Sequence, residues 1–239
     1  VKNLVGLKNL YQLISDSHLK YFYTRPRIPK SELIRHREGL IIGSACSAGE
    51  LYEAILNGKS DEELLSIASF YDYLEIMPMT NNHYLVEKGE LKSEKQLQDI
   101  NRKIIKIGED LKIPVVATGD VHYLDPEDGI YREVLLSGKG MDEETPADLY
   151  LRTTEEMLEE FSYLGAEKAY EVVVTNTNKV ADMCERISPI SPEKCPPHIE
   201  GCEQTIKDIA YGKAHELYGE ELPEIVKARL DKELDSIIK

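Results

Sequence analysis

The chain has 239 residues, of which 41% are hydrophobic and 31% are charged, as in an ordinary globular protein. This length suits one large domain, or a medium domain with a smaller piece beside it. No apolar run approaches the roughly 20 residues that cross a bilayer, so no membrane partner is expected. The net charge of −15 argues against a protein that binds nucleic acid over its whole surface.

The start of the sequence and its cysteines indicate whether the chain is a fragment and in which cellular compartment it lies. It opens on Val1 within a helical pattern, with no cleavable signal, which suggests a piece excised from a longer protein. Its four cysteines are too few and too scattered for a disulfide framework. Reduced thiols and a cytoplasmic location are therefore expected.

The first half alternates strands and helices. A helix is expected over 3–22, with Leu7, Leu10, Tyr11 and Ile14 on one face. The elements expected after it, in chain order, are a strand at 40–43, helices at 50–57 and from Ser60, a strand at 73–77, a long helix from Ser93 and a strand at 114–118. Ser60 and Ser93 each begin a capping-box pattern, with Glu63 and Gln96 three positions later. Continuously apolar strands joined by helices predict a parallel sheet that is buried on both faces.

The second half is expected to be mostly helical. Helices are predicted over 126–138, 154–162, 166–186, 203–218 and 223–238, with a possible short strand at 149–152. Four prolines between 189 and 197 mark a linker before the last two helices.

Side chains that can bind metal follow each of the three strands. Cys46 follows the first strand, His83 follows the second, and Asp120 and His122 follow the third. If the strands are parallel neighbours, these loops share one edge of the sheet, where α/β proteins hold metals and substrates. Asp120 and His122 form the strongest pair, because carboxylate and neutral imidazole both bind divalent metals. A hydrolytic site with two or three metals would need more ligands, so the pattern predicts half of a site.

Two further clusters are open to more than one interpretation. Between His18 and Arg37 there are six basic residues and one acid, and Arg25, Arg27 and Lys30 could contact phosphates or simply form a solvated face. The second cluster contains Cys195, His198 and Cys202, which could hold zinc. Their spacing fits no common zinc finger, which favours a proline-rich linker with incidental cysteines.

Several motifs together closely resemble the PolC-type α subunit of bacterial DNA polymerase III, the replicative polymerase of low-GC Gram-positive bacteria. They are Gly6-Leu7-Lys8-Asn9-Leu10-Tyr11, Pro26-Arg27-Ile28-Pro29-Lys30, Gly43-Ser44-Ala45-Cys46, Ser69-Phe70-Tyr71-Asp72-Tyr73-Leu74-Glu75, Val116-Ala117-Thr118-Gly119-Asp120-Val121-His122-Tyr123, Arg152-Thr153-Thr154-Glu155-Glu156-Met157-Leu158 and Tyr218-Gly219-Glu220-Glu221-Leu222-Pro223-Glu224. The resemblance runs through essentially the whole chain, in order.

The resemblance implies a fold and a division of the chain. In that family an inserted 3′–5′ exonuclease interrupts a polymerase-and-histidinol-phosphatase (PHP) domain. Residues 1–187 would be the C-terminal part of this PHP domain, an α/β fold with an incomplete parallel (β/α) barrel. Residues 188–239 would be a proline-rich linker and helices that lead into the polymerase palm.

The resemblance also implies a function. The parent enzyme would be a DNA-directed DNA polymerase, a nucleotidyltransferase that uses Mg²⁺ and acts with DNA and replisome components. This segment would contain no catalytic residue and would be inactive alone. It would contribute Cys46, Asp120 and His122 to a PHP site for Zn²⁺ or Mn²⁺.

Two other functions remain open from the sequence. One is a free-standing metal-dependent phosphoesterase of the PHP type, which would need further histidines upstream. The other is a non-catalytic module whose acidic stretch 140–171, with ten acids against two basic residues, binds a basic partner.

Overall fold

The computed structural model describes residues 1–140, 148–190, 193, 197 and 199–238. They form two compact units, Val1–Pro189 and Ile190–Lys239. Among the described residues, no helix is both long and apolar enough to cross a membrane.

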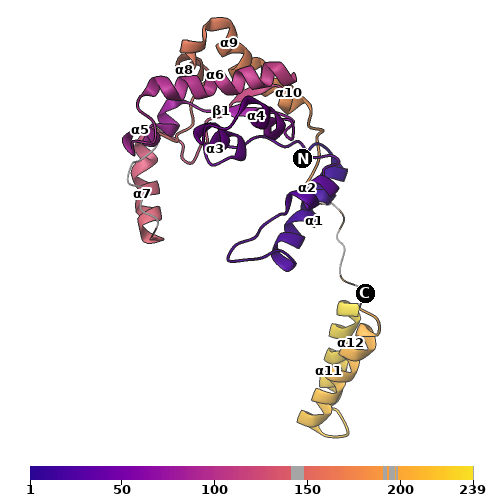
Figure 1. The fold of residues 1–239 in the computed structure, drawn as a ribbon. Coiled ribbons are helices and arrows are strands. Elements are labelled where there is room, and N and C mark those ends of the chain that lie inside the picture. The colour runs from indigo at the N-terminus through magenta and orange to yellow at the C-terminus, as the bar shows by residue number, and fades with distance from the viewer. Residues whose placement is uncertain (141–147, 191–192, 194–196, 198, 239) are drawn as a thin grey trace. The chain divides into compact units, whose positions relative to one another are not determined.

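The first unit is α/β, with many helices around a small parallel sheet (Figure 1). Its elements up to the second strand are α1 (Leu4–Leu19), α2 (Lys30–Arg35), α3 (Glu50–Leu56), α4 (Asp61–Ala68), β1 (Leu74–Ile76), the 3-10 turn η1 (Met79–Asn82), α5 (Tyr84–Glu87), α6 (Glu94–Leu111) and β2 (Val115–Ala117). The elements after it are η2 (Pro126–Asp128), α7 (Gly129–Gly138), α8 (Thr154–Glu160), η3 (Ser162–Leu164), α9 (Ala166–Tyr170), the π-helical segment η4 (Glu171–Thr175) and α10 (Asn176–Asp182). The second unit contains α11 (Cys202–Tyr218) and α12 (Glu224–Ile238), which contact each other.

The predicted parallel pairing is confirmed for two strands. β1 and β2 pair in parallel, with Leu74 opposite Val115 and Ile76 opposite Ala117, and α6 makes the crossover between them. All three residues of β2 are buried, as expected for a strand covered on both faces. A closed or half-closed barrel is not visible in this sheet of two strands.

The strand expected at 40–43 is reduced to one parallel bridge, between Gly43 and Tyr73. Beside this bridge the Asp72 N–H donates to the carbonyl oxygen of Ile42 at 2.8 Å, while the Ile42 N–H donates to a carboxylate oxygen of Asp72, also at 2.8 Å. Arg37 holds that carboxylate at 3.0 Å. The pairing therefore combines one backbone hydrogen bond with a side-chain one and does not extend into a ladder.

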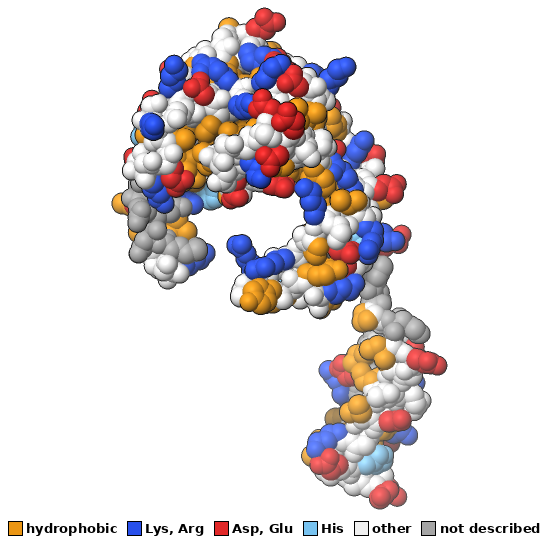
Figure 2. Space-filling model, in the orientation of Figure 1, with side chains coloured by type: hydrophobic (Ala, Val, Ile, Leu, Met, Phe, Trp, Pro, Cys, Tyr) orange, Lys and Arg blue, Asp and Glu red, His pale blue; other side chains and the backbone are white. Residues whose placement is uncertain are grey.

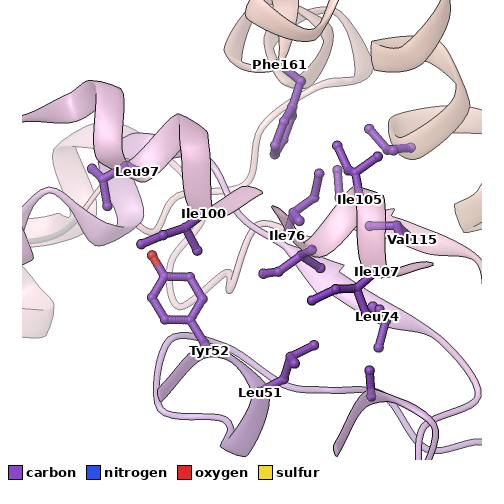
Figure 3. Close-up of a cluster of buried hydrophobic side chains, with 14 of the residues drawn as sticks. Leu51, Tyr52, Leu74, Ile76, Leu97, Ile100, Ile105, Ile107, Val115 and Phe161 are labelled. Atoms are coloured by element: carbon purple, nitrogen blue, oxygen red, sulfur yellow. The ribbon is translucent and has the colours of Figure 1, made fainter. Parts of the chain in front are cut away.

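The core lies where α3, α4, α6 and η4 cover the two strands (Figure 3). Leu74 and Ile76 of β1 meet Leu51 of α3 and Ile104 of α6, and Phe161 is fully buried in the same cluster. Burying one such side chain stabilises the fold by about 1.5–3 kcal/mol. This packing is what fixes the strand ends and the loops that follow them.

The predicted first helix is present as α1, but the face that holds Leu7, Leu10, Tyr11 and Ile14 is only partly buried. Tyr11 and Ile14 are 49% and 45% exposed, whereas the helix buries Leu13 and, at its start, Gly6. The reason is a close backbone approach, since a Cβ at Gly6 would lie 1.8 Å from the carbonyl oxygen of Gly39. Only glycine allows this contact, and it turns the Gly6 side of α1 inward.

Candidate metal centre

Three loops leave the strand ends and hold the predicted ligands. Cys46 is half-buried in the loop after the Gly43 bridge. Asp120 and His122 are exposed and follow β2 directly. The loops after two neighbouring parallel strands and the bridge beside them start at one edge of the sheet, as predicted.

Asp120 and His122 lie together. The Nδ1 atom of His122 is 3.8 Å from Oδ1 of Asp120 and forms a 2.7 Å hydrogen bond with the backbone carbonyl oxygen of Asp120. A carbonyl oxygen only accepts hydrogen bonds, so Nδ1 carries a proton, and in the neutral ring Nε2 then has the lone pair. The imidazole is therefore in the tautomer that binds a metal through Nε2.

Both ligand loops contain an unusual backbone conformation. Asp120 has φ of +47° and Ala45, next to Cys46, has φ of +62°. Residues with a Cβ seldom adopt this left-handed region, although Asp does so more readily than Ala. Such conformations are common at functional sites, where the surrounding structure enforces them.

Glu75 ties the two loops together, and its role was missed from the sequence. Its carboxylate accepts hydrogen bonds from the Ala45 N–H at 3.2 Å and from the Thr118 hydroxyl at 3.1 Å. Its own N–H donates to the Ser44 hydroxyl at 2.9 Å. An acid within an otherwise apolar strand was the available signal, because a half-buried carboxylate needs donors around it.

His83, the fourth side chain that could bind metal, lies beside acidic residues of two helices. Its two ring nitrogens lie 3.8 Å from Glu87 and 3.5 Å from Glu94, so it faces acids of neighbouring helices. The structure shows no contact that joins it to Asp120 and His122.

The donor set fits one side of a metal site. A thiol, a carboxylate and an imidazole are all ligands of Zn²⁺. Across residues 1–140, 148–190 and the described part beyond, however, no three His, Cys, Asp or Glu side chains lie close enough to hold an ion. Among the described residues Cys46, Asp120 and His122 therefore do not form a three-ligand set, and their role as metal ligands stays a prediction.

The basic residues predicted to contact DNA fall into two groups. Lys30 is 3.3 Å from Glu50 and lies over the ring of Phe70 at 4.4 Å, so it has structural partners. Arg27 stacks on the ring of Tyr23 at 4.9 Å, in the exposed loop between α1 and α2. In Figure 2 basic and hydrophobic side chains lie side by side on this loop.

Cys195 and His198 of the possible zinc cluster lie outside the described residues. Cys202 is exposed and begins α11. The zinc hypothesis at this cluster stays untested.

Comparison with known proteins gives the family context. The PHP domain model matches residues 1–86. DNA polymerase III PolC-type of Clostridium perfringens is 55% identical over 99% of the chain, and the protein of that name from Bacillus subtilis is 52% identical over 99%. The chain spans only 16% of the Clostridium protein and 17% of the Bacillus one. The resemblance inferred from the motifs is confirmed, since the chain is similar, over 99% of its length, to one segment of these two PolC-type polymerases.

Proposed function

We propose that this chain is a working segment of a replicative DNA polymerase of the PolC type. The observation that supports this most strongly is identity of 55% maintained over 99% of the chain, which leaves no part of it unmatched by one family. The full-length protein would add deoxynucleotides to a primer with Mg²⁺, and proofreading would accompany it. The segment itself supports that activity and does not perform it.

A primer-extension assay tests this assignment. The full-length protein is expected to extend a primed template with deoxynucleotides and Mg²⁺, whereas the 239-residue chain alone is expected to be inactive. Failure of the full-length protein to extend any primer, with hydrolysis of phosphoesters instead, would favour the free-standing phosphoesterase.

Within the polymerase, residues 1–187 would form the later part of a PHP barrel and residues 188–239 would lead into the palm. The parallel β1–α6–β2 unit supports the barrel assignment, since barrels are built from such units. DNA and replisome components would be partners of the whole enzyme, and its place of action would be the cytoplasm.

Cys46, Asp120 and His122 would supply one side of a site for Zn²⁺ or Mn²⁺, completed by residues from elsewhere in the polymerase. A bound divalent ion there would crosslink the strand-end loops and act as a Lewis acid toward any substrate it met. The residues of this chain orient the donors: Glu75 joins the loops, and the carbonyl of Asp120 leaves Nε2 of His122 available. We therefore assign the site a mainly architectural role, in support of the palm.

Metal content, measured by inductively coupled plasma mass spectrometry, tests the site. The full-length protein is expected to hold more metal than its Cys46→Ser and Asp120→Asn variants. Cys184→Ser is the matched control, because Cys184 is an exposed thiol of the same unit. Equal metal content in all four proteins would contradict the assignment.

Arg25 and Arg27 form a second, smaller proposal: they contact the DNA backbone. The exposed loop around them, with Tyr23 and Phe22 at 68% and 56% exposure, has the basic and aromatic character of nucleic-acid contacts. In the full-length protein, replacing both arginines by Ala is expected to weaken DNA binding and to reduce the salt slope of the affinity by roughly one to two. Lys30→Ala, whose amine is paired with Glu50, is the control. An unchanged slope in the double variant would remove this proposal.

A further inference from the structure

The turn that holds Asp120 and His122 lies between β2 and a single parallel bridge, Tyr123 to Tyr150, and the His122 N–H donates to the carbonyl oxygen of Leu149 at 2.8 Å. The ladder ends where the Thr118 N–H donates to the carbonyl oxygen of Ile76 at 3.0 Å. Asp120 then adopts its left-handed conformation at φ +47°. A left-handed residue with a Cβ costs roughly 1–2 kcal/mol, so other contacts must keep the turn in place.

A buried asparagine makes one such contact. Asn81, at 4% exposure in η1, donates from Nδ2 to the carbonyl oxygen of Gly119 at 2.7 Å. This carbonyl belongs to the peptide that joins Gly119 to Asp120. The hydrogen bond therefore fixes the plane of the peptide directly before the left-handed residue.

A buried arginine determines which way that asparagine faces. Arg152 donates to Oδ1 of Asn81 at 3.4 Å and to the hydroxyl of Thr80 at 2.8 Å, and its side chain is 2% exposed. A guanidinium can only donate, so the oxygen of the Asn81 amide must face it. The amide NH₂ group is then left to face Gly119.

These contacts connect directly to the imidazole. Asn81 fixes the Gly119–Asp120 peptide, and the carbonyl of Asp120 accepts the hydrogen bond from Nδ1 of His122. Rotation of the turn would separate that carbonyl from the ring. The Leu149 carbonyl holds the backbone of His122, and the contact made by Asn81 of η1 holds the carbonyl that orients its ring.

We propose that Asn81, oriented by Arg152, is a positioning residue for the metal ligands Asp120 and His122. This inference depends on the proposed metal site and adds to it the residues that preorganise the ligands before an ion arrives. Outer partners of metal ligands change metal affinity by about 10–100-fold when they are removed.

A pair of isosteric substitutions tests the proposal. Asn81→Asp removes the NH₂ donor and sets an oxygen against the Gly119 carbonyl. Asn82→Asp is the matched control, because Asn82 is also 4% exposed in η1 but donates only to the hydroxyl of Tyr52, at 3.4 Å. Both variants bury a new carboxylate in η1, facing Arg152 at position 81 and the Tyr52 hydroxyl at position 82.

The readout is Zn²⁺ affinity, measured by competition with a chromophoric chelator in the metal-stripped full-length protein. Only the Zn²⁺ that the unsubstituted protein binds and the Asp120→Asn variant does not bind is counted, and this is called the Asp120-dependent component. For this component Asn81→Asp is expected to bind about 10–100-fold more weakly, and Asn82→Asp to bind as the unsubstituted protein does. If Asn81→Asp does not fold, Arg152→Lys replaces it, since a single ammonium cannot keep both donor contacts; its affinity is also expected to fall.

The outcomes separate the two proposals. An Asp120-dependent component that is equally tight in Asn81→Asp, or in Arg152→Lys if that variant is used, would overturn the positioning role and leave the metal site intact. No Asp120-dependent uptake in the unsubstituted protein would overturn the metal site and the positioning role with it.

Discussion

Arg152 is a buried arginine of the first unit that makes several polar contacts. Besides its bonds to Asn81 and Thr80, it lies over the ring of Tyr150 at 4.4 Å and 3.5 Å from Oε1 of Glu160. Its Nε atom has no hydrogen-bond partner among the described residues. A buried cation is retained only where acceptors, an aromatic face and an opposite charge surround it, and here all three are present.

Glu160 supplies the opposite charge and should make stability depend on pH. Burial raises the pKa of the Glu160 carboxyl above its usual value, and the attraction of Arg152 opposes part of that rise. The folded state then holds the proton more tightly than the unfolded state. The contribution of Glu160 is complete below its unfolded pKa of about 4.3 and is lost as pH rises through the folded pKa.

Glu160→Gln is therefore expected to remove one downward step from the profile of unfolding free energy against pH. The unfolding free energy of the unsubstituted protein minus that of the variant should therefore fall as pH rises, because only the unsubstituted protein has the carboxyl group whose pKa is raised. Urea unfolding followed by circular dichroism between pH 4 and 7 measures this difference, in which the other carboxyl groups cancel. A difference between the two proteins that does not fall as pH rises would contradict the shift.

At the scale of elements, two serines with the same sequence pattern have different roles. The Ser60 hydroxyl accepts from the Glu63 N–H at 3.3 Å, and Glu63 accepts from the Ser60 N–H at 3.0 Å, a complete capping box on α4. Ser93 precedes α6 but its side chain makes no capping bond. Gln96 instead accepts from the Lys92 N–H, one residue earlier. The predicted capping box at Ser93 is therefore wrong.

This difference predicts unequal costs of two identical substitutions. Ser60→Ala should destabilise the fold by about 1 kcal/mol, the usual cost of losing a cap. Ser93→Ala should lower the free energy of unfolding by no more than a few tenths of a kcal/mol. No capping hydrogen bond is lost there, and substitutions at the surface generally have small effects. Urea unfolding of the two variants side by side checks this, and equal losses would show that Ser93 caps α6 in solution.

The sequence predicted best those helices and strands whose buried residues follow a regular spacing of apolar side chains. Ile100, Ile104 and Ile107 repeat along α6 and are buried as expected, and the apolar run at β2 is buried throughout. The pairing of β1 with β2 follows from the helical crossover between them. The grouping of Asp120 with His122 is equally local, because two positions separate them.

The features that the sequence did not predict depend on contacts between distant segments. The strand at 40–43 is reduced to a bridge, beside which the carboxylate of Asp72, thirty positions away, accepts the Ile42 N–H. The predicted helix over 166–186 contains a π-helical segment at Glu171–Thr175, next to Asn176, whose amide donates to Val115. The support of the ligand turn by Asn81 and Arg152 spans 38 and 71 positions. The spacing of residues within one segment cannot predict hydrogen bonds between residues so far apart in the sequence.

At the scale of the whole molecule, the surface combines strong negative charge with exposed apolar side chains. The net charge of −15 favours solubility. Yet α7 has no buried residue, and Ile130, Tyr131, Val134 and Leu135 are each 62–67% exposed. Figure 2 shows hydrophobic side chains at the surface of the first unit beside acidic and basic ones. Contiguous exposed apolar side chains of this kind promote association.

The isolated 239-residue chain is therefore expected to self-associate at raised concentration, despite its charge. Val134→Lys, which removes apolar area from the centre of the exposed face of α7, should shift sedimentation-velocity profiles toward the monomer. Glu133→Lys is the matched control, because it makes a larger change in charge at the neighbouring exposed position while leaving the apolar face intact. If charge alone governed association, the two variants would respond alike or Glu133→Lys would respond more. A response confined to Val134→Lys would assign the association to the apolar face, and a chain that stays monomeric without substitution would show that this face is stable in water.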